Sequence, residues 1–171
     1  MVKIVGAIII LLATTWAGFE AARRLSERPR QLRMLKTALQ SLEAEIMYGH
    51  VPLIEVATHL SRQIPKPISH FFERFAKKLQ TGEVSVKMAW DESLEETSKH
   101  TALQQGEIEV LRQFGETLGQ QDRASQQKHI LLALAHLERE ESDAREKQSR
   151  YEKMMKSLGF LSGLLLVILL I

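Results

Sequence analysis

Two uncharged apolar segments, one near each end of the 171-residue chain, limit how much of it can form a water-soluble core. The first covers residues 4–19 (IVGAIIILLATTWAGF) and the second residues 158–171 (LGFLSGLLLVILLI). As helices they would extend over about 24 and 21 Å, against a hydrocarbon core of about 30 Å. Flanking lysines can reach toward water, so a slightly short helix is tolerated. We therefore predict transmembrane segments within residues 1–26 and 157–171.

The charges beside these segments predict how the chain is oriented. Six basic and two acidic residues lie between positions 20 and 36, and five basic and two acidic between 145 and 156. Because positive charge resists translocation, the intervening domain, residues 27–156, is expected in the cytoplasm with the chain held at the cell membrane. A cleaved signal peptide is disfavoured, because no A-x-A site follows the first segment and arginines follow it at once. The residues expected at the membrane surface, in contact with lipids, are Arg23, Arg24, Arg28, Arg30, Lys153 and Lys156. Their adjacency to the membrane segments argues against nucleic acid as the partner.

The composition of the middle is that of an all-α protein. Leucine, glutamate, glutamine, arginine, lysine and alanine dominate it, and the whole chain has four prolines and no cysteine. Without cysteine a disulfide framework is excluded. We predict an antiparallel bundle of about six helices with N- and C-terminal transmembrane segments.

Apolar periodicity and the breakers glycine and proline divide the middle into helices. Pro29 is expected to mark a kink or restart after the N-terminal anchor. The expected helices are residues 30–48, 52–63, 68–80, 84–97, 103–118 and a last one from about 122 into the C-terminal segment. Because short connections favour antiparallel neighbours, the turns at Gly49, Gly82 and Gly119 should lie at one end of the bundle.

The glycines of this end have distinct expected roles. Gly49 suits a left-handed helix cap, and Pro52 suits the first turn of the next helix. Gly82 closes the 68–80 helix. Gly119 is expected to end the 103–118 helix, and Gly115, one turn earlier, removes a side chain where another backbone must come close.

Three glycine motifs resemble the cytoplasmic helical domain of the general secretion F family, the inner-membrane platform proteins of type II secretion and type IV pilus systems. They are GHVPLIEVA (49–57), GEVSVKMAW (82–90) and FGETLGQQD (114–122). A single copy of that domain between two apolar segments resembles the stage III sporulation protein AB family of endospore-forming bacteria. That resemblance implies a component of a channel-like secretion apparatus between mother cell and forespore, with the domain in the mother-cell cytoplasm beside a secretion-type ATPase.

The sequence shows little sign of a catalytic site. Asp91 with Glu95, and Glu92 with Glu96, are spaced for one helix face, but no histidine joins them at ligand spacing, so a solvated face is favoured. The run EREESD (138–143) is interpreted as solvent-exposed as well. The sequence has no H-E-x-x-H, G-x-S-x-G or P-loop motif. We predict no enzyme activity and no cofactor.

The leading hypothesis is a membrane-anchored assembly scaffold. Its expected partner-binding surface is Gly49, Pro52, Gly82, Gly115, Glu116 and Gly119, with Glu116 either binding a partner or fixing the turn. Two alternatives remain: a membrane-tethered enzyme using the acids of 91–96 with a metal, and a lipid-binding helical module driven by the arginines.

Overall fold

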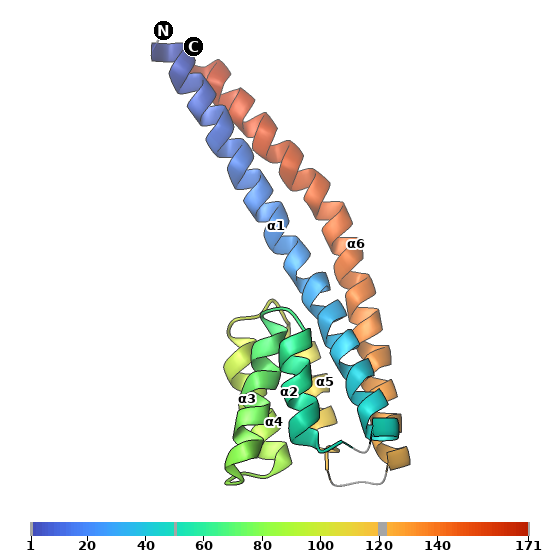
Figure 1. Cartoon of the computed structure of the whole chain (residues 1–171). Coiled ribbons are helices and arrows are strands. Elements are labelled where there is room, and N and C mark those ends of the chain that lie inside the picture. Colours follow the sequence, from blue (N-terminus) through green and yellow to red (C-terminus); the bar gives the residue numbers. More distant parts are fainter. Residues whose placement is uncertain (1, 50, 120–122, 171) are drawn as a thin grey trace. The chain divides into compact units, whose positions relative to one another are not determined.

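The computed structural model describes residues 2–49, 51–119 and 123–170, and every regular element in these ranges is helical. Six α-helices and one π-helical turn follow one another along the described chain (Figure 1). They are α1 (Val2–Ala44), η1 (Glu45–Gly49), α2 (Leu53–Gln63), α3 (Ile68–Thr81), α4 (Val86–Ser98), α5 (Gln105–Gly115) and α6 (Arg123–Leu170). The all-α prediction is confirmed.

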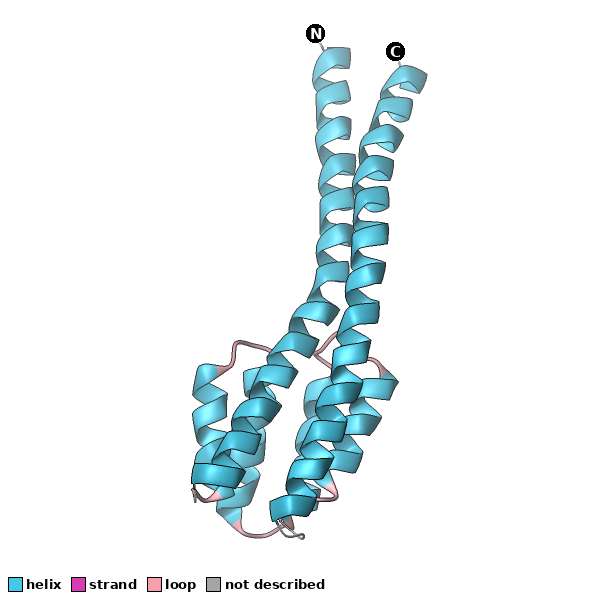
Figure 2. Cartoon of the chain, turned by 90° about the vertical axis from the view of Figure 1, so that its right-hand side faces the viewer, coloured by secondary structure: helices cyan, strands magenta, loops and turns pink. Residues whose placement is uncertain are grey.

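The chain divides into two compact units. One contains Met1–Glu27 with Asp143–Ile171, and the other is Arg28–Ser142. Residues 143–156, which the sequence analysis assigned to the bundle domain, thus belong with the N-terminal residues. In the first unit the early part of α1 and the late part of α6 lie side by side in both views (Figures 1 and 2).

The two apolar ends of the chain are helical but are not supported as transmembrane segments. Among the residues that the structure describes, no helix is long and apolar enough to cross a membrane.

The second unit is the helical bundle. Within it α2 packs against α3, α3 against α4 and α4 against α5, and short connections make these neighbours antiparallel (Figure 1). Their core is aromatic: Trp90 of α4 meets Phe71 and Phe75 of α3 edge-on at ring-centroid distances of 4.6 and 5.1 Å. Phe114 of α5 adds a third edge at 5.3 Å. Such pairs add to the free energy gained by burying the rings.

The leucine stripe of α1 forms the adjoining part of this core. Leu32, Leu35, Leu39 and Leu42 are all buried, as their three- and four-residue spacing predicts. In α6, Leu131 is half-exposed while Ala133 is buried.

Proline 29 does not interrupt α1, so the helix restart expected there is not observed. The helix runs through it without interruption, although proline removes one backbone donor. Both sides of this position are held: Arg28 forms ion pairs within the bundle, and Leu32, one turn later, is fully buried. The local cost of the proline is thus offset by tertiary contacts of the same helix.

Candidate partner-binding end of the bundle

The predicted glycine residues lie together at the end of the bundle where η1 finishes. Pro52 and Gly119 line the same groove, and a Cβ on Gly119 would lie 3.4 Å from Val86, in the first turn of α4 after Gly82. Glu116 pairs with Lys87 of the same turn at 2.9 Å. The antiparallel alternation inferred from the sequence therefore brings the three motifs to one end.

Gly82 forms an exposed reverse turn between α3 and α4. Its φ of 67° is in the left-handed region, and its amide donates to the Leu79 carbonyl at 3.3 Å. Ser85 then caps α4, since its side-chain oxygen accepts from the Met88 amide at 3.2 Å. No atom outside the immediate chain lies within 4 Å of a Cβ built on Gly82, so the turn presents open backbone to solvent.

Gly115 accommodates a side chain rather than the neighbouring backbone that was expected. A Cβ on this glycine would lie 2.7 Å from Nε1 and 2.8 Å from Cγ of Trp90. The indole is fully buried, and its Nε1 donates to the Leu111 carbonyl at 2.8 Å. Glycine at 115 thus lets α5 pack directly on the central tryptophan of the bundle.

The segment from Glu116 to Gly119 is a fixed turn, and α5 ends at Gly115 rather than at Gly119. Two successive bonds hold it: the Thr117 amide donates to Phe114 at 3.0 Å and the Leu118 amide to Gly115 at 3.3 Å. Leu118 is buried, while Gly119 has a φ of 76°. That left-handed residue turns the chain away from α5 before a further α-helical turn can form.

Glu116 fixes this turn to α4. Its carboxylate is 55% exposed and pairs with Nζ of Lys87, so a hydrogen bond from that lysine, with its charge, holds the pKa of Glu116 below its ordinary value. The same contact raises the pKa of Lys87. Both expected roles of Glu116 are compatible with this geometry, because the carboxylate both braces the turn and faces solvent.

A groove of 380 Å³ opens at this end of the bundle. It lies among η1, the start of α2, the 118–119 turn and the first turn of α6. Its lining residues are Glu45, Ile46, Val51, Pro52, Leu53, Val56, Leu118, Gly119 and Gln126. Pro52 is the residue before α2, and its carbonyl accepts from the amides of Glu55 and Val56 at 2.9 and 3.2 Å.

Gly49 departs from its predicted role as a left-handed cap. Its φ is not in the left-handed region, and it ends a π-helical turn instead. The side-chain carboxylate of Glu45 occupies the space where a Cβ on Gly49 would lie. The glycine therefore leaves room for the Glu45 carboxylate and does not supply a positive φ.

The predicted membrane-surface residues fall into three groups. Arg28 is not at a surface: its side chain is 12% exposed and pairs with Glu107 of α5 and with Glu140 of α6, the latter at 2.9 Å. Arg30 and Lys153 are exposed. The side chains of Arg23, Arg24 and Lys156 lie outside the described residues.

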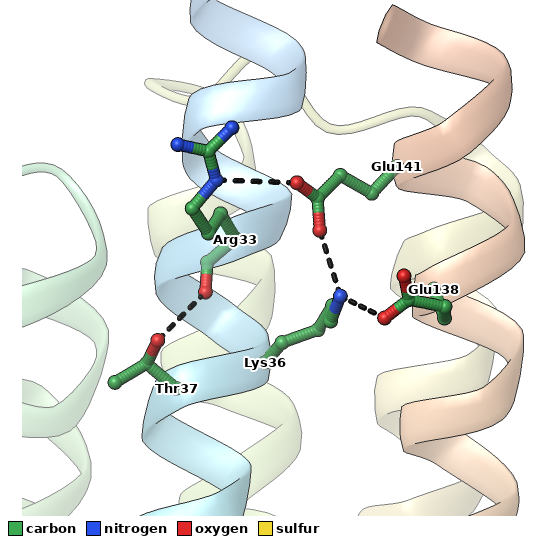
Figure 3. A network of polar contacts seen from close by, with 5 residues as sticks. All are labelled: Arg33, Lys36, Thr37, Glu138 and Glu141. Atoms are coloured by element: carbon green, nitrogen blue, oxygen red, sulfur yellow. Dashed lines mark hydrogen bonds and ion pairs between the residues drawn. The ribbon is translucent and has the colours of Figure 1, made fainter.

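An ion-pair network between α1 and α6 was missed by the sequence analysis, which assigned 138–143 to solvent. Lys36 of α1 lies between Glu138 and Glu141 of α6, with Nζ 2.8 Å from Glu141, and Arg33 reaches Glu141 at 3.2 Å (Figure 3). Glu141 is only 3% exposed. The only sequence indication of this network is that two basic residues lie three apart on α1 and two acidic residues three apart on α6. That these two helix faces contact each other is seen only in the structure.

Glu107 is the second residue that the sequence analysis missed. It is fully buried, pairs with Arg28, and accepts from the Gln104 amide in a capping box at the start of α5. A buried carboxylate requires such partners, since an unpaired charge there would be very costly. Glu107 is thus a structural residue that ties α5 to α1.

Two acids of α4, Glu92 and Glu96, are engaged in ion pairs with α3. Glu92 pairs with Lys78 at 2.6 Å, and Glu96 pairs with Arg74 and Lys78, each at 3.2 Å. Within the described residues, no group of three or more histidine, cysteine, aspartate or glutamate side chains has the arrangement of a metal site.

The fold and the candidate site together define a class of protein: a small all-α bundle with apolar terminal helices, in which the turns between helices form a candidate binding surface at one end. Comparison with known proteins narrows this class. The family model described as stage III sporulation protein AB matches residues 3–171. A curated protein of that name from Bacillus subtilis (strain 168) is 55% identical over 170 residues, covering 99% of each chain.

A solved structure of stage III sporulation protein AB (SpoIIIAB) is similar as well. It is 52% identical, with a TM-score of 0.70, over 72% of this chain and 98% of the solved one. The chain belongs to the stage III sporulation protein AB family, as the sequence resemblance predicted, and this supports a role in sporulation. The family description names no enzymatic activity.

Proposed function

We propose that this protein is a membrane-held, non-catalytic scaffold of a secretion-like channel apparatus used in endospore formation. Its bundle lies in the cytoplasm of the mother cell and binds other proteins of the apparatus, including a secretion-type ATPase. The observation that carries the proposal is the convergence of Gly82, Gly119 and the groove at one end of the bundle. Membership of a sporulation family supplies the cellular setting.

The apolar surface of the first unit supports attachment to a membrane. Among the described side chains of its two helices, nine large apolar ones are each more than half exposed, with Trp16 at 77%. They are Ile9, Leu12, Trp16, Phe19, Leu158, Phe160, Leu161, Leu165 and Ile168. Exposed apolar surface on this scale marks an interaction site, and burial in lipid is favourable by about 25 cal/mol per Å². The basic residues that follow the first apolar segment and precede the second favour a cytoplasmic bundle.

The turn end supports protein binding because it is rigid and open. Gly82 and Gly119 are exposed, their turns are fixed by caps and backbone hydrogen bonds, and the ion pair of Lys87 with Glu116 joins them. A preorganised surface loses little conformational entropy on binding. The resemblance of the three motifs to platform proteins of secretion systems suggests the ATPase as a partner.

Partner capture by turn variants tests this function. In Bacillus subtilis cells whose own stage III sporulation protein AB is replaced by this chain, we expect Gly82→Val or Gly119→Val to abolish crosslinking to partners and to lower heat-resistant spore counts. Gly82→Asn is the control for the turn itself, since asparagine tolerates the left-handed conformation. Gly106→Val controls for bulk, because Gly106 has open space around it at the start of α5. Unchanged capture by folded Gly82→Val and Gly119→Val variants would reject the proposal.

The absence of cysteine from the chain allows a clean test of location. A single exposed cysteine, Lys99→Cys, should react with a membrane-impermeant maleimide only after the cells are permeabilised, and the protein should sediment with membranes. Labelling in intact cells would place the bundle outside and contradict the proposal.

The alternative of a metal-dependent enzyme using residues 91–96 gains no support, because Glu92 and Glu96 are paired with cations of α3. The lipid-binding module loses Arg28 as a headgroup contact, since that side chain is committed inside the bundle.

A further inference from the structure

The groove at the turn end combines an apolar wall with one carboxylate. Ile46, Leu53, Val56 and Leu118 supply apolar surface, and Glu45 supplies the acid. All of these residues belong to the bundle unit. At 380 Å³ the groove is large enough for one or two apolar side chains of a bound segment, and is at the small end of the range of ligand sites.

Glu45 differs from Glu43 and Glu141 because it has no hydrogen-bond or ion-pair partner among the described residues. Within the described part of the chain its half-buried carboxylate forms no hydrogen bond and no ion pair. Two residues earlier, Glu43 accepts from Gln127 of α6 at 3.0 Å. A partly buried carboxylate beside apolar side chains gains more from a cation than one in open water, since the local dielectric constant is lower.

The backbone that carries Glu45 is specialised. Glu45–Gly49 is the π-helical turn η1, a rare geometry that is frequently found at functional sites. Gly49 leaves the space in which the Glu45 carboxylate lies. Tyr48 of the same turn is 79% exposed, and tyrosine is enriched in protein interfaces. The turn thus places an acid and an aromatic side chain beside the apolar wall.

We propose that this groove binds a basic amphipathic segment of a partner protein. An apolar side chain of the segment enters among Ile46, Leu53 and Leu118, and a neighbouring lysine or arginine pairs with Glu45. The inference rests on the scaffold function and specifies the chemistry of the partner. Charge complementarity selects the occupant: a segment with an acid at that position would meet Glu45 directly, and a purely apolar one would leave it unpaired.

Three synthetic 14-residue peptides test this chemistry on the full chain in neutral maltoside micelles, with empty micelles as the blank. The first has a leucine face with adjacent arginines, the second has glutamate for each arginine, and the third has alanine for each leucine. By fluorescence anisotropy we expect the first to bind about tenfold more tightly than either twin, the gain of one charge-assisted contact or one buried side chain.

Two charge-matched variants locate the acid responsible. Glu45→Gln should reduce the preference for arginine over glutamate to about twofold or less. Glu55→Gln should leave it unchanged, because Glu55 is exposed on the first turn of α2 and does not line the groove. Leu53→Trp, checked for helicity by circular dichroism, should weaken the leucine peptides by filling the groove.

Three outcomes would overturn the inference: no binding of the first peptide at about 1 mM, equal or tighter binding of the glutamate peptide, or an arginine preference that survives Glu45→Gln. The crosslinking assay separates this from a failure of the scaffold function. If Gly82→Val and Gly119→Val lose partner capture while Glu45→Gln keeps it, the scaffold stands and the groove is rejected. If all three keep capture, both are rejected.

Discussion

Replacing Gly115 with alanine should destabilise the bundle through Trp90. The added Cβ would lie 2.7 Å from the indole Nε1, and that ring is fully buried between Phe71, Phe75 and Phe114. The indole can move only by giving up its 2.8 Å hydrogen bond to Leu111 or its ring contacts.

The expected loss follows from three contributions. Overpacking a filled core costs about 1–3 kcal/mol. A weakened hydrogen bond adds up to about 1 kcal/mol, and the better helix propensity of alanine returns up to about 1 kcal/mol. Taken at their midpoints, these contributions give a net destabilisation of about 2 kcal/mol for Gly115→Ala, a factor of about 30 in the unfolding equilibrium. For a chain of this size that lowers Tm by about 4–8 °C.

Gly106→Ala is the matched control because it makes the same substitution in the same helix, with nothing within 4 Å of the new Cβ. It should be neutral or stabilising by up to about 1 kcal/mol. Urea unfolding in maltoside micelles, followed by tryptophan fluorescence in a Trp16→Phe background, reports on Trp90 alone, since the chain has two tryptophans. If Gly115→Ala proves as stable as Gly106→Ala, the close packing of Gly115 on Trp90 is refuted.

Two further substitutions test the buried acids. Glu107→Ala should cost about 3–5 kcal/mol, because it leaves the nearly buried Arg28 with only Glu140; a loss below about 1 kcal/mol by urea unfolding would contradict the assigned role. Burial raises the pKa of Asp91, whose Oδ1 is buried without a hydrogen-bond partner in the described structure. Folding then disfavours the ionised form of Asp91, so Asp91→Asn should be at least as stable as wild type at pH 7. As the pH falls toward 3 and Asp91 becomes protonated, the stability difference between wild type and the variant should shrink. A difference that stays constant over that pH range would count against it.

Helix positions were largely predictable because local signals agree with the tertiary structure. The expected 52–63 and 68–80 helices match α2 and α3 to within one residue at each end, since Gly82 and the prolines at 65 and 67 are strong breakers. The end of α5 was not predictable in the same way. The chain leaves the helix at Gly115 because Gly119 adopts a left-handed conformation. The spacing of apolar residues does not reveal that backbone conformation.

The candidate site was predictable in its location but not in its chemistry. Antiparallel alternation placed Gly82 and Gly119 at one end correctly. The pairing of Arg28 with Glu107 depends on residues 79 positions apart, and nothing local distinguishes an arginine facing lipid from one facing a buried glutamate. The groove carboxylate, Glu45, was missed because the π-helical turn η1 that presents it has no sequence signature of its own.

The π-helical turn η1 makes the end of α1 sensitive to the deletion of single residues. Its hydrogen bonds span five residues where an α-helix spans four, so it stores one surplus residue. Removing a single residue from Glu45–Gly49 would let ordinary α-helical winding resume and would change the positions of the remaining residues around the helix axis. Tyr48 would then turn to another side of the helix, so deletions here should alter recognition where substitutions elsewhere on α1 alter only stability.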